Sequence, residues 1–264
     1  MSTLVSQVRD DSVFALDFDG VLCDSAAESA VSAWRAGCLV WPEWRGAEPP
    51  AECLRHFRLL RPVIETGYQT VLLMRLIWLG RQTDEDLTND FQELSETLLK
   101  TLDRTPTELV ELFGQERDRW IASDPNGWYE RQRFYPEIIE AFRHALNQGA
   151  PVYILTTKQE RFVKVLLQKT GFDFPEDRIL GLERNRPKEA MLEYLLRKTA
   201  SAGATLHFVE DRLATLLRVI GQSNLDSVRL YLAEWGYNTA RERRIAWEHP
   251  RIMLWNIHQF LQVK

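Results

Sequence analysis

The sequence predicts an α/β protein whose mainly parallel sheet is interrupted, after its first strand, by an all-helical segment. An apolar strand near the N-terminus ends in two aspartates, and residues 25–133 then show helical periods without a convincing strand. From Phe134 onward, apolar strands alternate with helices, which is typical of a parallel sheet covered by helices. We therefore expect an α/β core domain of residues 1–24 and 134–264 and a helical domain of residues 25–133.

The expected first strand, residues 13–16, runs directly into Asp17-Phe18-Asp19-Gly20. Gly20 has no Cβ to obstruct a turn, so the backbone can curl there and bring both carboxylates into one small volume. Open α/β sheets bind their ligands at this end of the strands. Because two neighbouring carboxylates repel each other, the pair indicates a bound cation or separate acid and base roles, the ordinary alternative being a solvated turn.

Helix-breaking and helix-capping residues divide the helical segment. Pro62 and Gly80 interrupt or end apolar runs of helical period, while Thr83 and Thr105 are followed by acidic residues and predict helix starts. The sequence Asp124-Pro125-Asn126-Gly127 predicts a turn.

Six of the nine tryptophans lie in this segment, and we interpret most of them as the core of a compact helical module. The alternative is a substrate cleft with aromatic walls, in which an arginine binds a second anion. Arg75 is the arginine that we mark, because it lies within an otherwise apolar run.

Five apolar segments after Phe134 predict the remaining strands: residues 151–155, 178–182, 205–209, 228–232 and 251–254, with the last at an edge of the sheet. Polar residues follow two of them directly, Thr156-Thr157-Lys158 the first and Glu210-Asp211 the third. Lys188 opens a helix between them. In a parallel sheet these positions share one edge, so the side chains can meet there.

Together these groups supply what phosphoryl transfer needs: a nucleophile, a metal site, a cation and donors for the phosphate oxygens. Taken singly, each has an ordinary explanation. Thr156 could satisfy strand-end backbone groups, Glu210-Asp211 could cap the following helix, and Lys188 could be a surface lysine.

The run Asp17-Phe18-Asp19-Gly20-Val21 resembles the first motif, Asp-x-Asp-Gly-(Val/Thr), of the haloacid dehalogenase-like hydrolase superfamily, and the later segments follow in that family's order. The resemblance covers the catalytic core. It implies a Rossmann-like three-layer core with a mainly parallel sheet and a helical cap domain inserted after the first strand.

The resemblance also implies roles for the strand-end residues. Asp17 matches the nucleophile that becomes an aspartyl-phosphate, and Asp19 the general acid and base whose backbone carbonyl also reaches the metal. Thr156 matches the hydroxyl that binds the phosphate, and Lys188 the lysine that holds Asp17 and the transferring group.

The implied cofactor is Mg²⁺, which prefers oxygen ligands. Its site residues are Asp17, Asp19, Asp211 and Glu210, the last as a direct or outer partner, and we expect Thr157, Lys158 and Arg75 to bind substrate. Two features depart from the family pattern. Thr215 stands where a second acid is common, and the third motif has the order Arg186-Pro187-Lys188, so that Arg184 or Arg186 could replace Lys188.

The implied function is that of a Mg²⁺-dependent phosphatase of the phosphoglycolate phosphatase-like type, acting on a small phosphorylated metabolite. A phosphomutase shares every core residue and is the nearest alternative, since it differs in how the cap excludes water. A non-hydrolytic protein that binds a partner through the helical domain is the alternative from another class.

Composition limits the partners and the compartment. A net charge of −5 argues against nucleic acid or an acidic membrane surface, and the longest apolar stretch, residues 71–79, is too short to span a bilayer. Three cysteines and an N-terminus without signal-peptide features predict a cytoplasmic protein with reduced thiols. The oligomeric state is left open.

Overall fold

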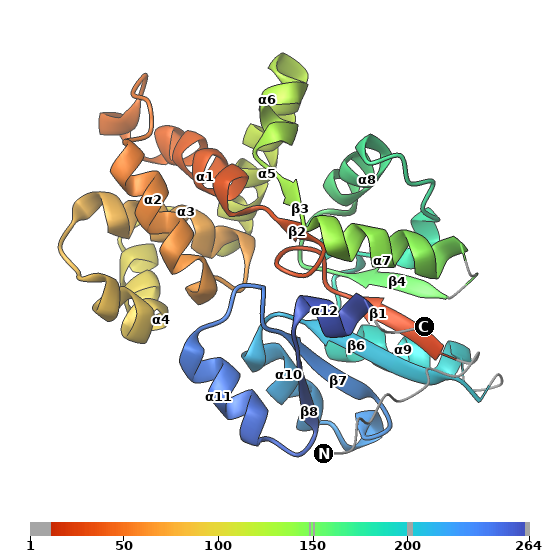
Figure 1. Cartoon of the computed structure of the whole chain (residues 1–264). Coiled ribbons are helices and arrows are strands. Elements are labelled where there is room, and N and C mark those ends of the chain that lie inside the picture. The colour runs from red at the N-terminus through yellow and green to blue at the C-terminus, as the bar shows by residue number, and fades with distance from the viewer. Residues whose placement is uncertain (1–11, 148, 150, 200–202, 262–264) are drawn as a thin grey trace. The chain divides into compact units, whose positions relative to one another are not determined.

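The structure is a computed structural model that describes residues 12–147, 149, 151–199 and 203–261. It separates into two compact units (Figure 1). The core unit consists of Met1–Asp24 and Phe134–Lys264, and the helical unit consists of Ser25–Arg133. The N-terminal residues on which the signal-peptide expectation rests lie outside the described part of the chain.

The core unit holds a six-stranded sheet in the order β5-β4-β1-β6-β7-β8, and every neighbouring pair is parallel. The prediction of a mainly parallel α/β fold is therefore confirmed, with the last strand at an edge. Two shorter strands, which the sequence did not indicate, form a separate sheet. The strands are β1 (Ser12–Leu16), β2 (Cys23–Asp24), β3 (Arg133–Phe134), β4 (Val152–Leu155), β5 (Ile179–Leu180), β6 (Thr205–Glu210), β7 (Arg229–Ala233) and β8 (Ile252–Trp255).

Helices cover both faces of the sheet (Figure 1). The helices of the core unit are α7 (Pro136–Asn147), α8 (Glu160–Lys169), α9 (Lys188–Thr199), α10 (Leu213–Ile220), α11 (Ala240–Glu248) and α12 (Ile257–Leu261). On one face, α9, α10 and α11 pack on the sheet through an apolar cluster that includes Ala15, Leu192, Phe208 and Leu216, all fully buried. Every residue of β1 and β4 is buried, which explains why both strands read as continuous apolar runs.

The strand order puts β1 at the centre of the sheet, between β4 and β6. The chain adds β4 and β5 on one side of β1, and later adds β6, β7 and β8 on the other side. This reversal is a topological switch point, the place where open α/β sheets bind their ligands. The residues that follow β1, β4 and β6 therefore meet at one edge of the sheet.

The helical unit is built from helices whose boundaries follow the sequence signals closely. They are α1 (Ala26–Val40), α2 (Ala51–Leu60), α3 (Gly67–Leu79), α4 (Asp84–Lys100), α5 (Pro106–Ser123) and α6 (Pro125–Glu130). Gly80 ends α3 with a φ of 59°, a conformation that glycine adopts without strain. Thr83 and Thr105 each accept a hydrogen bond from the backbone N–H three residues later, as expected of capping boxes.

The turn predicted at residues 124–127 is wrong, because a short helix starts there. The Asp124 carboxylate accepts a hydrogen bond from the Gly127 N–H at 2.9 Å, and Pro125 occupies the first helical position. An aspartate before a proline is common both in turns and at helix starts, and here Asp124 caps a helix.

Most tryptophans of the helical unit are buried in its core, as predicted. The Trp34 and Trp44 rings stack with their centroids 4.2 Å apart, and Trp41 packs against Trp44. Trp78 is the partly exposed exception. All three cysteines of the chain are free thiols, and no described helix is both long and apolar enough to cross a membrane.

His207 lies buried in β6, between Phe14 of β1 and Tyr231 of β7. Its Nδ1 lies 2.8 Å from the Tyr231 hydroxyl. Burial, aided by the positive charge of Arg229, lowers the pKa of the imidazole to about 4. The histidine is therefore a neutral part of the core.

We predict that this histidine makes the fold less stable in mild acid. An unfolded chain takes up a proton near pH 6.5 and the folded chain only near 4, so the free energy of unfolding should fall by about 1–3 kcal/mol across that interval. Urea titrations at a series of pH values would show a flatter dependence for His207→Gln. The exposed control His144→Gln should keep the wild-type slope. An unchanged slope in His207→Gln would contradict the prediction.

Candidate active site

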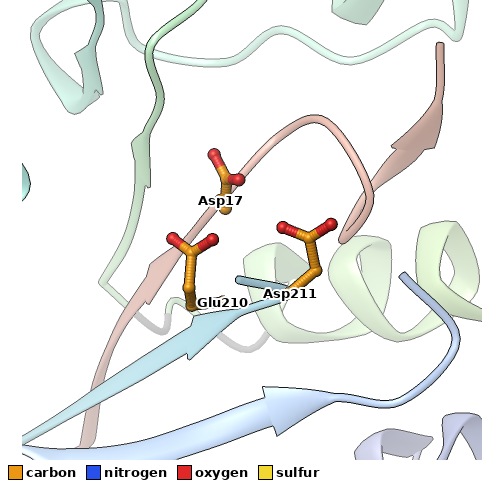
Figure 2. A group of neighbouring side chains, drawn as sticks. All are labelled: Asp17, Glu210 and Asp211. Atoms are coloured by element: carbon orange, nitrogen blue, oxygen red, sulfur yellow. The ribbon is translucent and has the colours of Figure 1, made fainter. Parts of the chain in front are cut away.

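Three carboxylates converge at the carboxyl ends of β1 and β6 (Figure 2). Asp17 follows β1, Glu210 ends β6, and Asp211 comes next. One oxygen from each lies within 4.8 Å of the others, and all three residues are buried. Among the described residues this is the only group of three or more acidic, histidine or cysteine side chains that could hold a metal ion.

Lys188, at the start of α9, binds two of these carboxylates. Its Nζ lies 2.9 Å from an Asp17 oxygen and 2.6 Å from a Glu210 oxygen. Burial opposes a charged ammonium, but the attraction of Asp17 and Glu210 outweighs it and raises the pKa of Lys188. The lysine is thus a permanent positive charge beside Asp17.

For Asp17 and Glu210, by contrast, the charged form is disfavoured. Burial raises the pKa of Asp17 to about 7, although Lys188 opposes the shift, while Glu210 adds to it. Burial likewise raises the pKa of Glu210 to about 7, with Lys188 opposing and Asp211 adding. Both shifts arise mainly from burial, which the single ammonium of Lys188 does not offset.

The donor set fits a divalent cation of the Mg²⁺ type. Three carboxylates facing one ammonium leave a surplus of two negative charges in a buried place, and a divalent ion neutralises that surplus. All the donors are hard oxygens, which Mg²⁺ prefers, and few protein ligands suffice because the ion keeps several waters.

Asp19 lies beside this cluster and has its own partner. Its carboxylate accepts a hydrogen bond from the Lys158 ammonium at 2.8 Å, and Lys158 itself is buried. Thr156 is buried too, and its hydroxyl oxygen accepts a hydrogen bond from the Lys158 N–H at 3.1 Å. A hydroxyl that accepts one bond can still donate its own hydrogen. Thr157 is exposed.

Two glycines allow the Asp211 side chain to sit where it does. A Cβ on Gly20, whose φ is 87°, would lie 2.0 Å from an Asp211 oxygen. A Cβ on Gly236 would lie 2.3 Å from the Asp211 Cβ. Any larger residue at either position would displace the carboxylate, so both glycines are part of the acid cluster's geometry.

Residues 235–238, which follow β7, fasten this arrangement and were missed by the sequence analysis. The Tyr237 N–H donates to an Asp211 carboxylate oxygen at 2.7 Å, and the Asn238 amide donates to the Asp211 carbonyl at 3.0 Å. The Tyr237 hydroxyl donates to Asp24 at 2.9 Å, while the Trp235 indole N–H donates to the Val21 carbonyl at 3.1 Å. The sequence signal that could have indicated this segment is Gly236, which comes soon after the buried strand β7 at the same edge of the sheet.

The unusual order Arg186-Pro187-Lys188 of the third motif still places a lysine beside Asp17. Lys188 is the residue that reaches Asp17, whereas Arg184 binds Glu160 at 2.6 Å and the carbonyl of Ile179 at 3.2 Å. Arg184 therefore ties the loop after β5 to the start of α8.

Thr215, which stands where a second acid is common in the family, makes a different contact. The Thr215 hydroxyl accepts a hydrogen bond from Arg218 at 3.1 Å, and Arg218 donates to Glu189 at 3.0 Å. Glu189 neighbours Lys188, so this chain of contacts links α10 to the start of α9. In this chain, Thr215 thus occupies a position that is often acidic and helps to hold the helix that carries Lys188.

Arg75 lies in the helical unit, where its contacts are structural. Its guanidinium lies 4.7 Å from the ring centroid of Trp78 and 4.8 Å from that of Trp41, and it pairs with Glu43 at 2.7 Å. These contacts account for a charge within an apolar run. They leave the substrate-binding role expected of Arg75 without support.

Comparison with known proteins places the chain in a family. Residues 12–216 match the family model described as haloacid dehalogenase-like hydrolase. No curated protein sequence matches the chain significantly.

Solved structures share the fold over nearly the whole chain. A predicted phosphatase from Clostridium acetobutylicum superposes with a TM-score of 0.58 at 15% identity, covering 95% of this chain and 96% of its own. A predicted phosphoglycolate phosphatase from Haemophilus somnus gives 0.57 at 18% identity, with coverage of 96% and 97%. A haloacid dehalogenase-like family protein from Streptococcus pneumoniae gives 0.55 at 14%, with coverage of 95% and 96%. With a family model spanning most of its length, the chain belongs to the haloacid dehalogenase-like hydrolases.

Proposed function

We propose that the protein is a Mg²⁺-dependent phosphatase that hydrolyses a small phosphorylated metabolite through an aspartyl-phosphate on Asp17. The observation that carries the proposal is the position of Asp17 in a buried cluster of three acids, with the Lys188 ammonium 2.9 Å from its carboxylate. Such a cluster supplies a nucleophile and compensates the charge of an incoming phosphate.

The chain's own residues account for both halves of the reaction. An Asp17 oxygen attacks phosphorus and forms the acyl-phosphate bond, while the bond to the substrate oxygen breaks and Asp19 gives that oxygen a proton. Asp19 then takes a proton from water, whose oxygen attacks phosphorus and releases inorganic phosphate and Asp17. Lys158, 2.8 Å from Asp19, would keep that carboxylate oriented.

Asp17 and Asp211 would hold the metal ion, together with the backbone carbonyl of Asp19, and Glu210 would serve as a direct or outer ligand. The bound ion supplies charge neutralisation for the phosphate oxygens. Lys188 would position Asp17 and share in that neutralisation, since its ammonium already bridges Asp17 and Glu210.

The phosphate oxygens would be bound by Thr156, Thr157 and Lys158, which follow β4 at the switch point. The helical unit would act as the cap that selects the substrate, because binding and selectivity in such folds reside in elements outside the sheet. The solved relatives described as a predicted phosphatase and a predicted phosphoglycolate phosphatase support a phosphate ester as the substrate class.

The test is a panel of phosphorylated metabolites incubated with the purified protein and Mg²⁺, with release of inorganic phosphate as the readout. We expect turnover that stops when EDTA removes the metal and returns when Mg²⁺ is added in excess. Phosphate release that is equal with and without EDTA would contradict the metal dependence. An isomerised sugar phosphate without free phosphate would identify a phosphomutase instead, and no reaction with any compound would favour a binding protein.

A further inference from the structure

The helical unit contains a trough with a volume of about 540 Å³, a size that suits a small organic ligand. Three segments of the unit line it: one face of α1, residues 47–58, and residues 120–133, which include the end of α5 and α6. Figure 1 labels these helices. We call it the α1 trough. None of its lining residues belongs to the acid cluster of the core unit.

The least exposed charged residue of the α1 trough is an arginine. Arg35 is half-buried, whereas every other charged lining residue is exposed. Those exposed residues are Arg58, Arg131, Arg133, Glu48, Asp124 and Glu130. The lining therefore carries charges of both signs, and its one partly buried charge is a cation.

The guanidinium of Arg35 lies on an aromatic ring and pairs with no carboxylate in the part of the chain that the structure describes. It lies 4.1 Å from the ring centroid of the buried Trp120, and the guanidinium of Arg131 lies 5.9 Å from the same ring. A ring face compensates a cation only in part and accepts none of the in-plane hydrogen bonds that five N–H groups offer.

Two other arginines of the same unit show what completes such a contact. Arg117 lies 4.0 Å from the ring centroid of Phe113 and also donates two hydrogen bonds of 2.7 Å to the Glu28 carboxylate. Arg75 likewise combines tryptophan rings with an acid, Glu43. Among the described residues Arg35 has the ring without the acid, so its guanidinium N–H groups are available to an anion that enters the trough.

The surroundings of Arg35 are firmly held. The fully buried Glu28 of α1 binds Arg117 of α5 and also accepts hydrogen bonds from Ser32 at 2.6 Å and from the Trp128 indole of α6 at 3.2 Å. This network joins the helices on two sides of the α1 trough. A preformed site loses little entropy when a ligand binds.

Most of the uncharged residues that line the α1 trough are apolar. Burial, with nearby Glu116 and Glu48, raises the pKa of the Cys38 thiol, which is therefore neutral. Besides Trp34 and Trp120, the apolar lining residues are Ala27, Val31, Ala47, Pro49 and Leu54.

We infer that the α1 trough is a second binding site, for a small organic anion whose carboxylate or phosphate head binds Arg35 and Arg131 and whose apolar body lies along Val31 and Leu54. The chemistry at Asp17 does not require this ligand. The site thus goes beyond the proposed phosphatase activity and would serve an effector.

The test is calorimetric titration of the full chain carrying Asp17→Asn, in EDTA, with phenylphosphonate and phenylacetate as anionic probes and benzyl alcohol as the neutral one. We expect both anions to bind and the alcohol not to bind. Adding Arg35→Gln should weaken anion binding at least tenfold, and the exposed Arg131→Gln should weaken it several-fold. Arg55→Gln, an exposed arginine of α2 outside the α1 trough, is the control and should change nothing.

Circular dichroism would establish that the Arg35→Gln chain is folded, and Arg131→Gln tests the same site from an exposed position. Anion binding that survives both substitutions would belong to the core unit and would overturn the inference. So would equal binding of benzyl alcohol, or no heat with any probe. The assay needs no turnover, so its failure and a failure of the metabolite panel are separate results.

Discussion

Replacing Asp17 with asparagine is expected to reduce kcat for phosphate release by about 10⁴-fold or more, because the amide cannot form an acyl-phosphate. The change keeps the side chain's size, and the Lys188 ammonium can still donate to the amide oxygen at the 2.9 Å position. Steady-state kinetics on a substrate found in the metabolite panel would measure the loss.

The same variant carries a second, independent readout. Removing one of three buried carboxylates halves the surplus negative charge, so the metal-free protein at pH 8 should melt at a temperature no lower than the wild type. The exposed control Asp90→Asn should change neither kcat nor the melting temperature. An Asp17→Asn enzyme that retains a tenth of the wild-type rate would refute the assignment of the nucleophile.

Gly236→Ala is expected to disable the site from a loop that carries none of its proposed chemistry. The added Cβ would lie 2.3 Å from the Asp211 Cβ and 2.6 Å from the Gly20 carbonyl oxygen, so the acid must move. A misplacement of roughly 1 Å near reacting groups costs about 10²-fold in rate, and we expect Mg²⁺ affinity to fall about 10–100-fold. The overpacking should also lower stability by about 1–3 kcal/mol.

Activity as a function of Mg²⁺ concentration, with melting curves at each concentration, would measure both effects. Gly67→Ala is the matched control, since its added Cβ would meet its nearest atoms at 3.7 Å, an ordinary packing distance. Wild-type metal dependence in Gly236→Ala would show that Asp211 does not need its present position.

Much of the fold could be predicted because local signals agree with the tertiary structure. The apolar runs at β1 and β6 are buried on both faces, and each ends in acids, so a parallel sheet had to bring Asp17 and Asp211 to one edge. The capping boxes at Thr83 and Thr105 act within four residues and were equally readable.

What escaped prediction depends on contacts between distant segments. The pairing of Lys158 with Asp19 joins residues 139 positions apart, and the bond from Tyr237 to Asp211 requires the loop after β7 to fold back over the site. The first contact leaves no local pattern, and the only local hint of the second is Gly236 just after a buried strand. The pairing of Arg75 with Glu43 escaped prediction for a related reason, since the sequence cannot show that the two residues lie side by side.

Tyr237 contacts both the acid cluster and the end of the segment that leads into the helical unit. Its backbone N–H holds an Asp211 carboxylate oxygen at 2.7 Å, while its hydroxyl holds Asp24, the last residue before the chain enters the helical unit. One residue therefore fixes both the acid cluster and the last core residue before the helical unit. A phenylalanine at this position would keep the backbone bond to Asp211 but lose the bond to Asp24.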